Sequence, residues 1–287
     1  MRKLYMILAA GLASLNIYAG NPASEALPFM QIDYTPRSIA MGNSNLGCSS
    51  AVALADFKFK GGIGYDNYMP ELSGTRYMIG GIAAKRNSFG FSASFQRGTG
   101  DKISGENYSP SEILLNLGAG VAMTENFGIG VNVKYAHEQL LSDYSNKAVA
   151  FDLTASWRYK TSMISGGITC IGESVKSSTK EAYPLPTALD LAGNHTFVFT
   201  EDHSVQLAAK ADYYLSGAFA AGAGVEYSYA GMVFARAGYH YGGESLVPSF
   251  ASAGLGLHLG EFFVDASYVF ASDVLNNSFA ISVGVCF

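Results

Sequence analysis

The 287-residue chain has a formal net charge of −5, and 49% of its residues are hydrophobic while only 14% are charged. Soluble chains usually carry about 25% charged residues, so this composition is unusual for a protein surrounded by water. The net negative charge and the lack of Lys/Arg clusters argue against a nucleic-acid partner.

The first 19 residues are typical of a secretory signal peptide. Arg2 and Lys3 precede an apolar stretch from Leu4 to Leu15, and the small residue Ala19 marks the expected cleavage point. We therefore expect the mature chain to begin at Gly20. No later apolar run approaches the roughly 20 residues that a membrane helix needs.

Residues 20–60 contain Pro22, Pro28 and Pro36 and show no alternation strong enough to define a strand. From Gly61 onward, bulky apolar residues alternate with small or polar ones in segments of about ten residues, and this period of two predicts β-strands. The predicted strands are residues 61–68, 76–84, 88–97, 112–123, 126–138, 148–160, 162–171, 186–199, 203–214, 217–230, 232–242, 249–259, 261–271 and 277–287.

Tight connections alternate with long ones along almost the whole series of strands. Only residues 215–217 break this rule, because they are short where a long loop is expected. An even number of antiparallel strands, with short turns at one rim and long loops at the other, is the pattern of a transmembrane β-barrel. A soluble sandwich would also alternate, but its outer face would need far more charge.

The last strand illustrates the expected lipid-facing side. Phe279, Ile281, Val283, Val285 and Phe287 share one face, and small residues lie between them. A strand protein can cross a bilayer only as a closed ring, because lipid cannot satisfy unpaired backbone groups. The fold class is therefore all-β: a transmembrane antiparallel barrel of about 14 strands over residues 61–287, with outer-membrane lipid as its surroundings. Aromatic residues near the strand ends suit two interfacial girdles.

Nine glycines fall on the inward face of the predicted strands, and they are Gly118, Gly120, Gly128, Gly130, Gly222, Gly224, Gly254, Gly256 and Gly284. Glycine weakens a strand unless another backbone or a ligand approaches closely. The pattern favours a hatch or plug segment, residues 20–60, folded inside the lumen. Two alternatives stay open: inward glycines also permit barrel curvature, and part of residues 20–60 can form a first strand.

Three stretches resemble the PorV/PorQ family, relatives of the FadL-type outer-membrane barrels. In "TPRSIAMGNSNLG" the matching core is Arg37, Ala40, Met41 and Gly42; the other stretches are "YPLPTALDLAGNH" at 183–195 and "ARAGYHYGG" at 235–243. The sequence departs from the family after Cys48, where it lacks the usual Asp-rich, Asn-Pro-Ala stretch.

This resemblance implies a fourteen-stranded barrel in the outer membrane of a Gram-negative cell. It also implies a role in protein secretion or surface attachment, with secretion-system proteins or exported cargo as partners. The alternative, implied by the FadL relatives, is a transporter of small hydrophobic compounds. We expect both termini to lie on the periplasmic side.

Ionisable residues on the inward face are the candidates for function, because a lumen can hold charge that lipid cannot. Lys134 and Asp152 lie symmetrically about one long loop, and Glu226 and Arg236 lie about one tight turn, so each pair is expected to meet across neighbouring strands. The full set of candidate lumen and plug contacts is Arg37, Met41, Lys134, Asp152, Arg158, Glu226, Arg236 and Asp265.

Signals for catalysis or metal binding are weak, so we predict a non-enzyme with no cofactor and no metal. Gly128-Ile-Gly130 has no following helix, which excludes the nucleotide-binding interpretation. A barrel lipase needs a serine and a histidine together near one rim, and the sequence alone reveals no such pair. The three cysteines allow at most one disulfide, for which Cys48 and Cys286 are the candidates.

Overall fold

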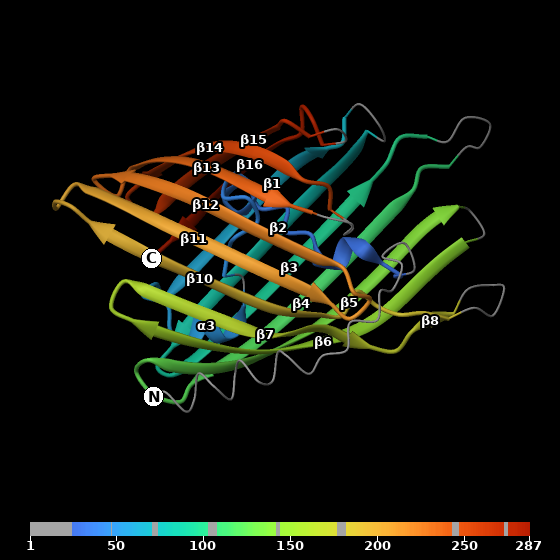
Figure 1. The fold of residues 1–287 in the computed structure, drawn as a ribbon, viewed down its shortest axis with the longest axis horizontal. Helices are drawn as coiled ribbons and strands as arrows, with labels where there is room; N and C mark the ends of the chain where they lie inside the picture. Colours follow the sequence, from blue (N-terminus) through green and yellow to red (C-terminus); the bar gives the residue numbers. More distant parts are fainter. Residues whose placement is uncertain are drawn as a thin grey trace.

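The computed structural model describes residues 25–46, 48–70, 74–102, 108–141, 144–176, 182–242, 247–272 and 275–287. Fourteen of its strands form one closed antiparallel barrel in the ring order β1-β16-β15-β14-β13-β12-β11-β10-β7-β6-β5-β4-β3-β2. This confirms the fold class and the strand number expected from the alternation. Figure 1 shows the strands running obliquely round a single ring.

The barrel strands are β1 (Phe59–Tyr68), β2 (Thr75–Arg86), β3 (Phe89–Thr99), β4 (Ser111–Ala122), β5 (Phe127–Leu141), β6 (Tyr144–Tyr159), β7 (Ser162–Gly172), β10 (Ala188–Val198), β11 (His203–Tyr214), β12 (Phe219–Tyr229), β13 (Val233–Tyr241), β14 (Phe250–Leu259), β15 (Phe262–Phe270) and β16 (Phe279–Cys286). The ring closes between β1 and β16, where Ile63 pairs with Val283. Phe287 then accepts hydrogen bonds from the backbone N–H groups of Lys58 and Phe59.

Three of the tight turns have the positive φ that two-residue hairpins require. Asn87 and Lys160 have φ values of 55° and 52°, and Gly260 has a φ of 61°. Mirror-image turns of this kind match the twist of the flanking strands. These turns share one end of the barrel with the chain's C-terminus, which we call the short-turn rim; the opposite end is the long-loop rim.

Side-chain exposure matches the predicted faces. Ile63, Leu117 and Trp157 on the outer face are 63%, 64% and 58% exposed, whereas the inward Asp66 and Ala280 are each 1% exposed. Apolar side chains exposed all round a ring would be unfavourable in water but suit hydrocarbon. The barrel is therefore a transmembrane one. No helix in the described ranges has the length and apolar character to cross a membrane.

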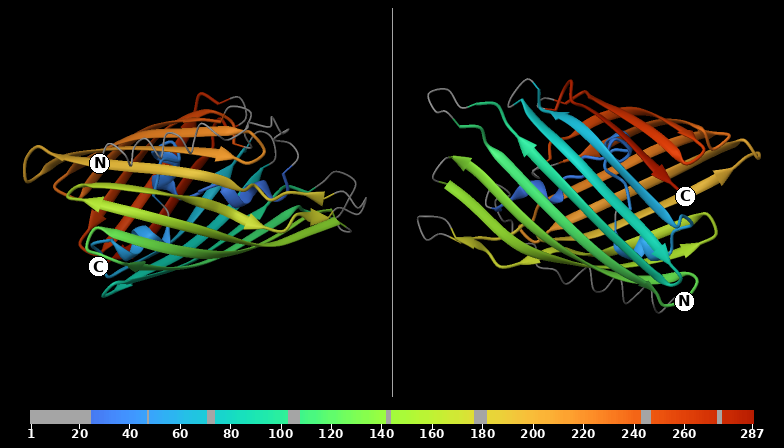
Figure 2. Two further views of the ribbon diagram at one scale, coloured as in Figure 1. Left: turned by 60° about the horizontal axis from the view of Figure 1, so that its bottom comes forward. Right: turned by 180° about the vertical axis from the view of Figure 1, so that it is seen from behind.

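Residues 25–58, apart from Gly47, form the lumenal segment. It carries a 3₁₀-helix, η2 (Pro28–Gln31), and two short helices, α2 (Pro36–Ala40) and α3 (Ser49–Ala53). Proline opens η2 and α2, where its missing N–H costs nothing. Figures 1 and 2 show this blue segment enclosed by the strands from every side that is drawn.

Two features of the wall were missed by the sequence analysis. Strands β5 and β6 run further toward the long-loop rim than predicted, since their ladder continues to Leu141 and Tyr144. The residues in this extension do not alternate between apolar and polar, so the sequence pattern did not reveal it. A small hairpin, β8 (Val175–Lys176) with β9 (Ala182–Tyr183), lies in the connection predicted as loop. Strands of two residues are too short to show a period.

Candidate lumenal site

The lumenal segment lies against the inward glycines of the barrel. A Cβ atom at Gly224 would lie 2.5 Å from the Met41 carbonyl oxygen, and one at Gly130 would lie 2.5 Å from the Ser50 nitrogen. Most of the nine glycines predicted to face inward make such contacts with this segment; Gly256 and Gly284 instead make room for the barrel's own Arg236, Asp265 and Phe263 side chains. Close approach of a second backbone therefore explains the pattern better than curvature alone.

Four charged side chains join α2 to strands β12, β13 and β15. We call Arg37, Glu226, Arg236 and Asp265 the four-charge cluster. Arg37 of α2 donates from Nε and Nη2 to the two carboxylate oxygens of Glu226, each at 2.9 Å. Arg236 donates to the same carboxylate at 2.5 Å and to Asp265 at 2.5 Å. The side chains of Glu226, Arg236 and Asp265 are at most 7% exposed, so few water molecules compete for these bonds.

The other predicted site residues lie in separate places. Lys134 forms an ion pair with Asp152 at 3.0 Å, but the two are diagonal neighbours, since Lys134 pairs with Ala150 in the ladder. Arg158 donates to the carbonyl of Leu54 at 2.7 Å and binds the Asp56 carboxylate at the short-turn rim. The hydrogen bond from Arg158 to the Asp56 carboxylate lowers the pKa of Asp56 below its usual value.

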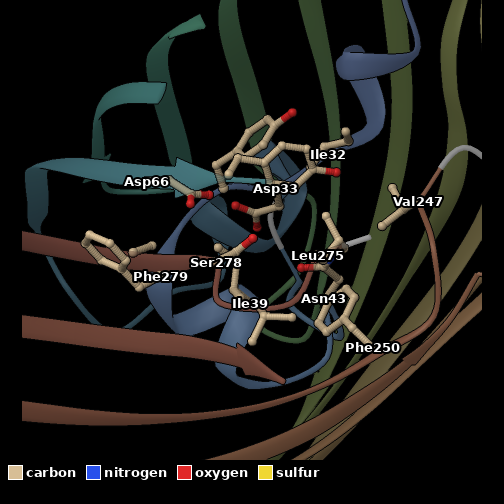
Figure 3. Close-up of a pocket in the computed structure, with 14 residues that line it drawn as sticks. Ile32, Asp33, Ile39, Asn43, Asp66, Val247, Phe250, Leu275, Ser278 and Phe279 are labelled. Carbon is tan, nitrogen blue, oxygen red and sulfur yellow. The ribbon is translucent and has the colours of Figure 1, made fainter. Parts of the chain in front are cut away.

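Aromatic packing fixes the lumenal segment nearer the long-loop rim. The ring of Tyr34 stacks on Tyr77 of β2 with centroids 3.9 Å apart and meets Tyr68 of β1 edge-on at 5.3 Å. A cavity of about 20 Å³ lies beside this cluster and is lined mainly by apolar side chains, including Phe250 and Leu275. Figure 3 shows residues that line this cavity, among them Asp33, Asp66, Phe250 and Leu275. The space admits one water molecule at most.

A much larger cavity of about 640 Å³ lies between the lumenal segment and the barrel. Its wall on β1, β2 and β3 carries mainly small inward side chains, namely Gly62, Gly64, Gly81, Ala83, Ser92 and Ser94, together with the larger Lys60, Ile79 and Gln96. The opposite wall, on β5 to β11, is polar and includes Lys134, Asp190 and Lys210. Lys210 and Asp212 were expected on the inward face, but Tyr34, Asp33 and Asp190 were missed, although Asp190 has the inward parity that could have revealed it.

The barrel wall is irregular between β6, β7 and β10. The β6–β7 register shifts between Phe151 and Leu153, and Cys170 has a φ of 54° there, which is a β-bulge. The β7–β10 ladder ends where Thr169 pairs with Ala188. Gln31 of η2 fills this place by donating to Thr169 Oγ1 at 3.1 Å and to the Pro186 carbonyl.

The structure brings together one serine–histidine pair that the sequence alone did not reveal. Ladder pairing places Ser162 opposite His195, with Oγ and Nδ1 2.7 Å apart. Both share the outer face of Ile164 beside the short-turn rim. Among the described residues no carboxylate is hydrogen-bonded to His195, and the neighbouring backbone N–H groups belong to the β-ladder. The pair therefore lacks the orienting group and the oxyanion donors that a hydrolase needs.

The predicted disulfide between Cys48 and Cys286 is wrong, because all three cysteines are free. Cys48 instead lies 3.5 Å from the hydroxyl of Ser156 on β6, on the other side of the lumen from the β1–β16 closure. Ser50 donates to Cys48 Sγ at 3.3 Å and lies 2.8 Å from the same serine hydroxyl. These contacts hold α3 against the barrel wall without a covalent bond.

No protein-family model and no curated protein matches the chain. Solved structures do match its fold. The toluene transporter TbuX of Ralstonia pickettii has a TM-score of 0.62 at 13% identity, over 90% of this chain and 100% of that one. The outer membrane protein Omp33 of Acinetobacter baumannii has a TM-score of 0.54 at 8% identity, over 80% and 98%. A Pseudomonas aeruginosa FadL homologue has a TM-score of 0.50 at 12% identity, over 93% and 98%. The chain thus has the fold of FadL-like outer-membrane barrels.

Proposed function

We propose that this protein is an outer-membrane channel that passes small hydrophobic compounds. The observation that carries the proposal is the cavity of about 640 Å³ inside a closed, lipid-facing barrel. Its volume is within the range of small-molecule sites, and its β1–β3 wall offers small side chains past which a ligand can move. The likeness to a toluene transporter supports this reading.

The lumenal segment acts in this proposal as the hatch that controls passage. Two of its contacts with the wall are the four-charge cluster on β12, β13 and β15 and the close backbone approach to inward glycines. The interrupted wall at β7 and β10, against which Gln31 lies, supports a path that opens when η2 moves. Residues 1–19 as signal peptide and residues 20–60 as hatch stay the predicted boundaries.

Secretion, the role implied by the resemblance to PorV/PorQ proteins, stays a prediction without structural support. The solved structures with this fold include a transporter of a small compound, which favours the alternative reading. A non-catalytic role is part of the proposal and agrees with the geometry of Ser162 and His195. The placement of the termini on the periplasmic side also stays a prediction.

Uptake of a neutral fluorescent probe tests this function. The protein would be expressed in a Gram-negative host whose outer membrane excludes phenylnaphthylamine, and the rate of fluorescence increase would be measured. We expect wild-type protein to raise this rate. The Ser94→Phe variant, which places a ring in the cavity beside Gly81, should lower it several-fold, because the ring blocks the space along the β1–β3 wall.

The matched control is Ala93→Phe on the same strand. Ala93 shares the outer face with Phe91 and Phe95, which are 53% and 43% exposed, so the added ring meets lipid. This variant should transport as wild type does. Equal rates with and without the wild-type protein, or equal effects of the two substitutions, would overturn the proposal.

A further inference from the structure

The polar wall of the cavity has an unbalanced set of charges around Lys210. Lys210 of β11 forms an ion pair with Asp212 at 2.9 Å. Asp190 of β10 lies directly opposite Asp212 in the ladder. Asp33 of the lumenal segment also lies close enough to Lys210 to interact with it electrostatically. We call Asp33, Asp190, Asp212 and Lys210 the Lys210 cluster. Its three carboxylates and one ammonium group leave a formal charge of −2.

Among the cations of this cavity, Lys60 of β1 lies on the opposite wall, over the Phe263 ring at 5.1 Å, and the others are paired elsewhere. The Lys134 ammonium is engaged by Asp152, whose carboxylate also accepts from Asn132 at 3.1 Å and from the Cys170 backbone N–H at 2.8 Å. Arg37 and Arg236 are engaged by Glu226 and by Asp265 in the four-charge cluster. Like charges placed directly opposite on two strands are unfavourable, so Asp190 and Asp212 gain from an additional positive charge.

The unsatisfied polar atoms nearby are mostly acceptors. Among the described residues, Oδ1 of Asp190, Oδ1 of Asn132 and Oδ1 of Asn116 have no hydrogen-bond partner. Asn132 is 4% exposed, and all three residues line the same cavity. A buried acceptor without a donor is costly. The wall therefore favours a ligand that brings hydrogen-bond donors and positive charge.

The opposite wall is less polar, although Lys60 and Gln96 also line it. Strands β2 and β10 are six steps apart in one direction round the ring of fourteen and eight in the other, so they face each other across the lumen. The β2 wall presents Gly81 and Ala83, and Ile79 lies next to them along the cavity. A ligand between these walls meets carboxylates on one side and mainly small or apolar side chains on the other.

We propose that the lumenal cavity selects amphipathic amines, compounds with an ammonium group and a small hydrophobic body. The ammonium group binds between Asp190 and Asp212, and the hydrophobic body lies along the β1–β3 wall. This inference deepens the proposed function and rests on it, since it names the class of compound that the channel prefers. Anionic compounds of the same shape are disfavoured by the two excess negative charges.

Three water-soluble probes of one shape test the inference by titration calorimetry on the full-length mature protein in a nonionic detergent. They are phenethylamine, phenethyl alcohol and phenylacetate. We expect phenethylamine to bind about tenfold or more tightly than phenethyl alcohol, as charge-assisted hydrogen bonds imply. Phenylacetate should bind more weakly than the alcohol. The wild-type comparison needs no variant, so it does not depend on the folding of a mutant.

Variants then locate the site. Asp190→Asn combined with Asp212→Asn should abolish the preference for the amine while leaving the affinity for the alcohol within about twofold. The control is Asp101→Asn, because Asp101 lies outside the cavity at the long-loop rim, where it pairs with Arg76 and is 65% exposed. This control should keep the full preference.

The outcomes separate the two proposals. Equal affinities for amine and alcohol, or an amine preference that survives the double substitution, overturn the present inference while probe uptake through the barrel still supports a channel. Protein-independent phenylnaphthylamine uptake overturns the channel itself. Amine preference that persists in Asp101→Asn and is lost in the double variant supports both.

Discussion

Replacing Arg236 with alanine should release the lumenal segment and raise the conductance of the barrel. Arg236 is the central residue of the four-charge cluster, since it holds Glu226 and Asp265 at once and its side chain is 1% exposed. Removing one partner of a buried ion pair costs about 3–5 kcal/mol, because the remaining charge stays buried without compensation. Here two carboxylates lose their partner, and only Glu226 keeps Arg37.

Single-channel recording and limited proteolysis would measure this change. The variant should show larger or more frequent openings and new cleavage within residues 25–58, while the β-strands remain protected. Arg76→Ala is the control, because Arg76 forms an ion pair with Asp101 in which both side chains are more than half exposed, and such pairs contribute little. Traces and digestion patterns identical to wild type would show that the cluster does not hold the segment.

Valine at Gly224 should displace the lumenal segment by a steric route. Its Cβ would lie 2.5 Å from the carbonyl oxygen of Met41 and 2.7 Å from its Cα. These are backbone atoms, which cannot rotate away as a side chain can. Valine is itself favourable in a strand, so we expect the barrel to form and the lumenal segment to lose its contact with β12.

Gly193→Val is the matched control, because Gly193 lies on the outer face of β10 and its nearest neighbour to an added Cβ is 3.5 Å away. Cysteine-free protein carrying a single thiol label at position 41 would report the difference. The label should become accessible to a water-soluble quencher in Gly224→Val and stay protected in Gly193→Val. Protection in both variants would mean that the segment does not depend on this close approach.

Alternation made the barrel predictable because each strand has one apolar environment and one polar environment along its whole length. The closing strand shows this plainly: Phe279 and Ile281 are 42% and 47% exposed on the lipid side, whereas Ala280 is 1% exposed. Glu226 and Arg236 were also predictable as a pair, since a tight turn fixes the register of its two strands.

The path of the lumenal segment was not predictable from residues 20–60 themselves. Its helices are five residues long at most, too short for a helical period, and its stability comes from contacts distant in sequence. Arg37 meets Glu226 across 189 residues. Besides Arg37 and Met41, the sequence signal of this packing lay in the partner strands, as glycines where a Cβ would collide with Met41 or Ser50.

The irregular wall between β6, β7 and β10 shows a second limit. The bulge depends on the left-handed backbone of Cys170, whose N–H turns toward Asp152 at 2.8 Å. Nothing about a cysteine in an alternating segment predicts that conformation. The neighbouring Pro184 and Pro186 were visible in the sequence, and they explain why the β10 ladder begins only at Ala188.

The most direct test of the lipid-facing barrel uses its one tryptophan. Trp157 is the only tryptophan of the chain, and it is 58% exposed on the outer face of β6. In vesicles, its fluorescence should be quenched strongly by lipids brominated on their acyl chains and only weakly by aqueous iodide. Strong quenching by iodide without quenching by the brominated lipids would place this face in water and contradict the account.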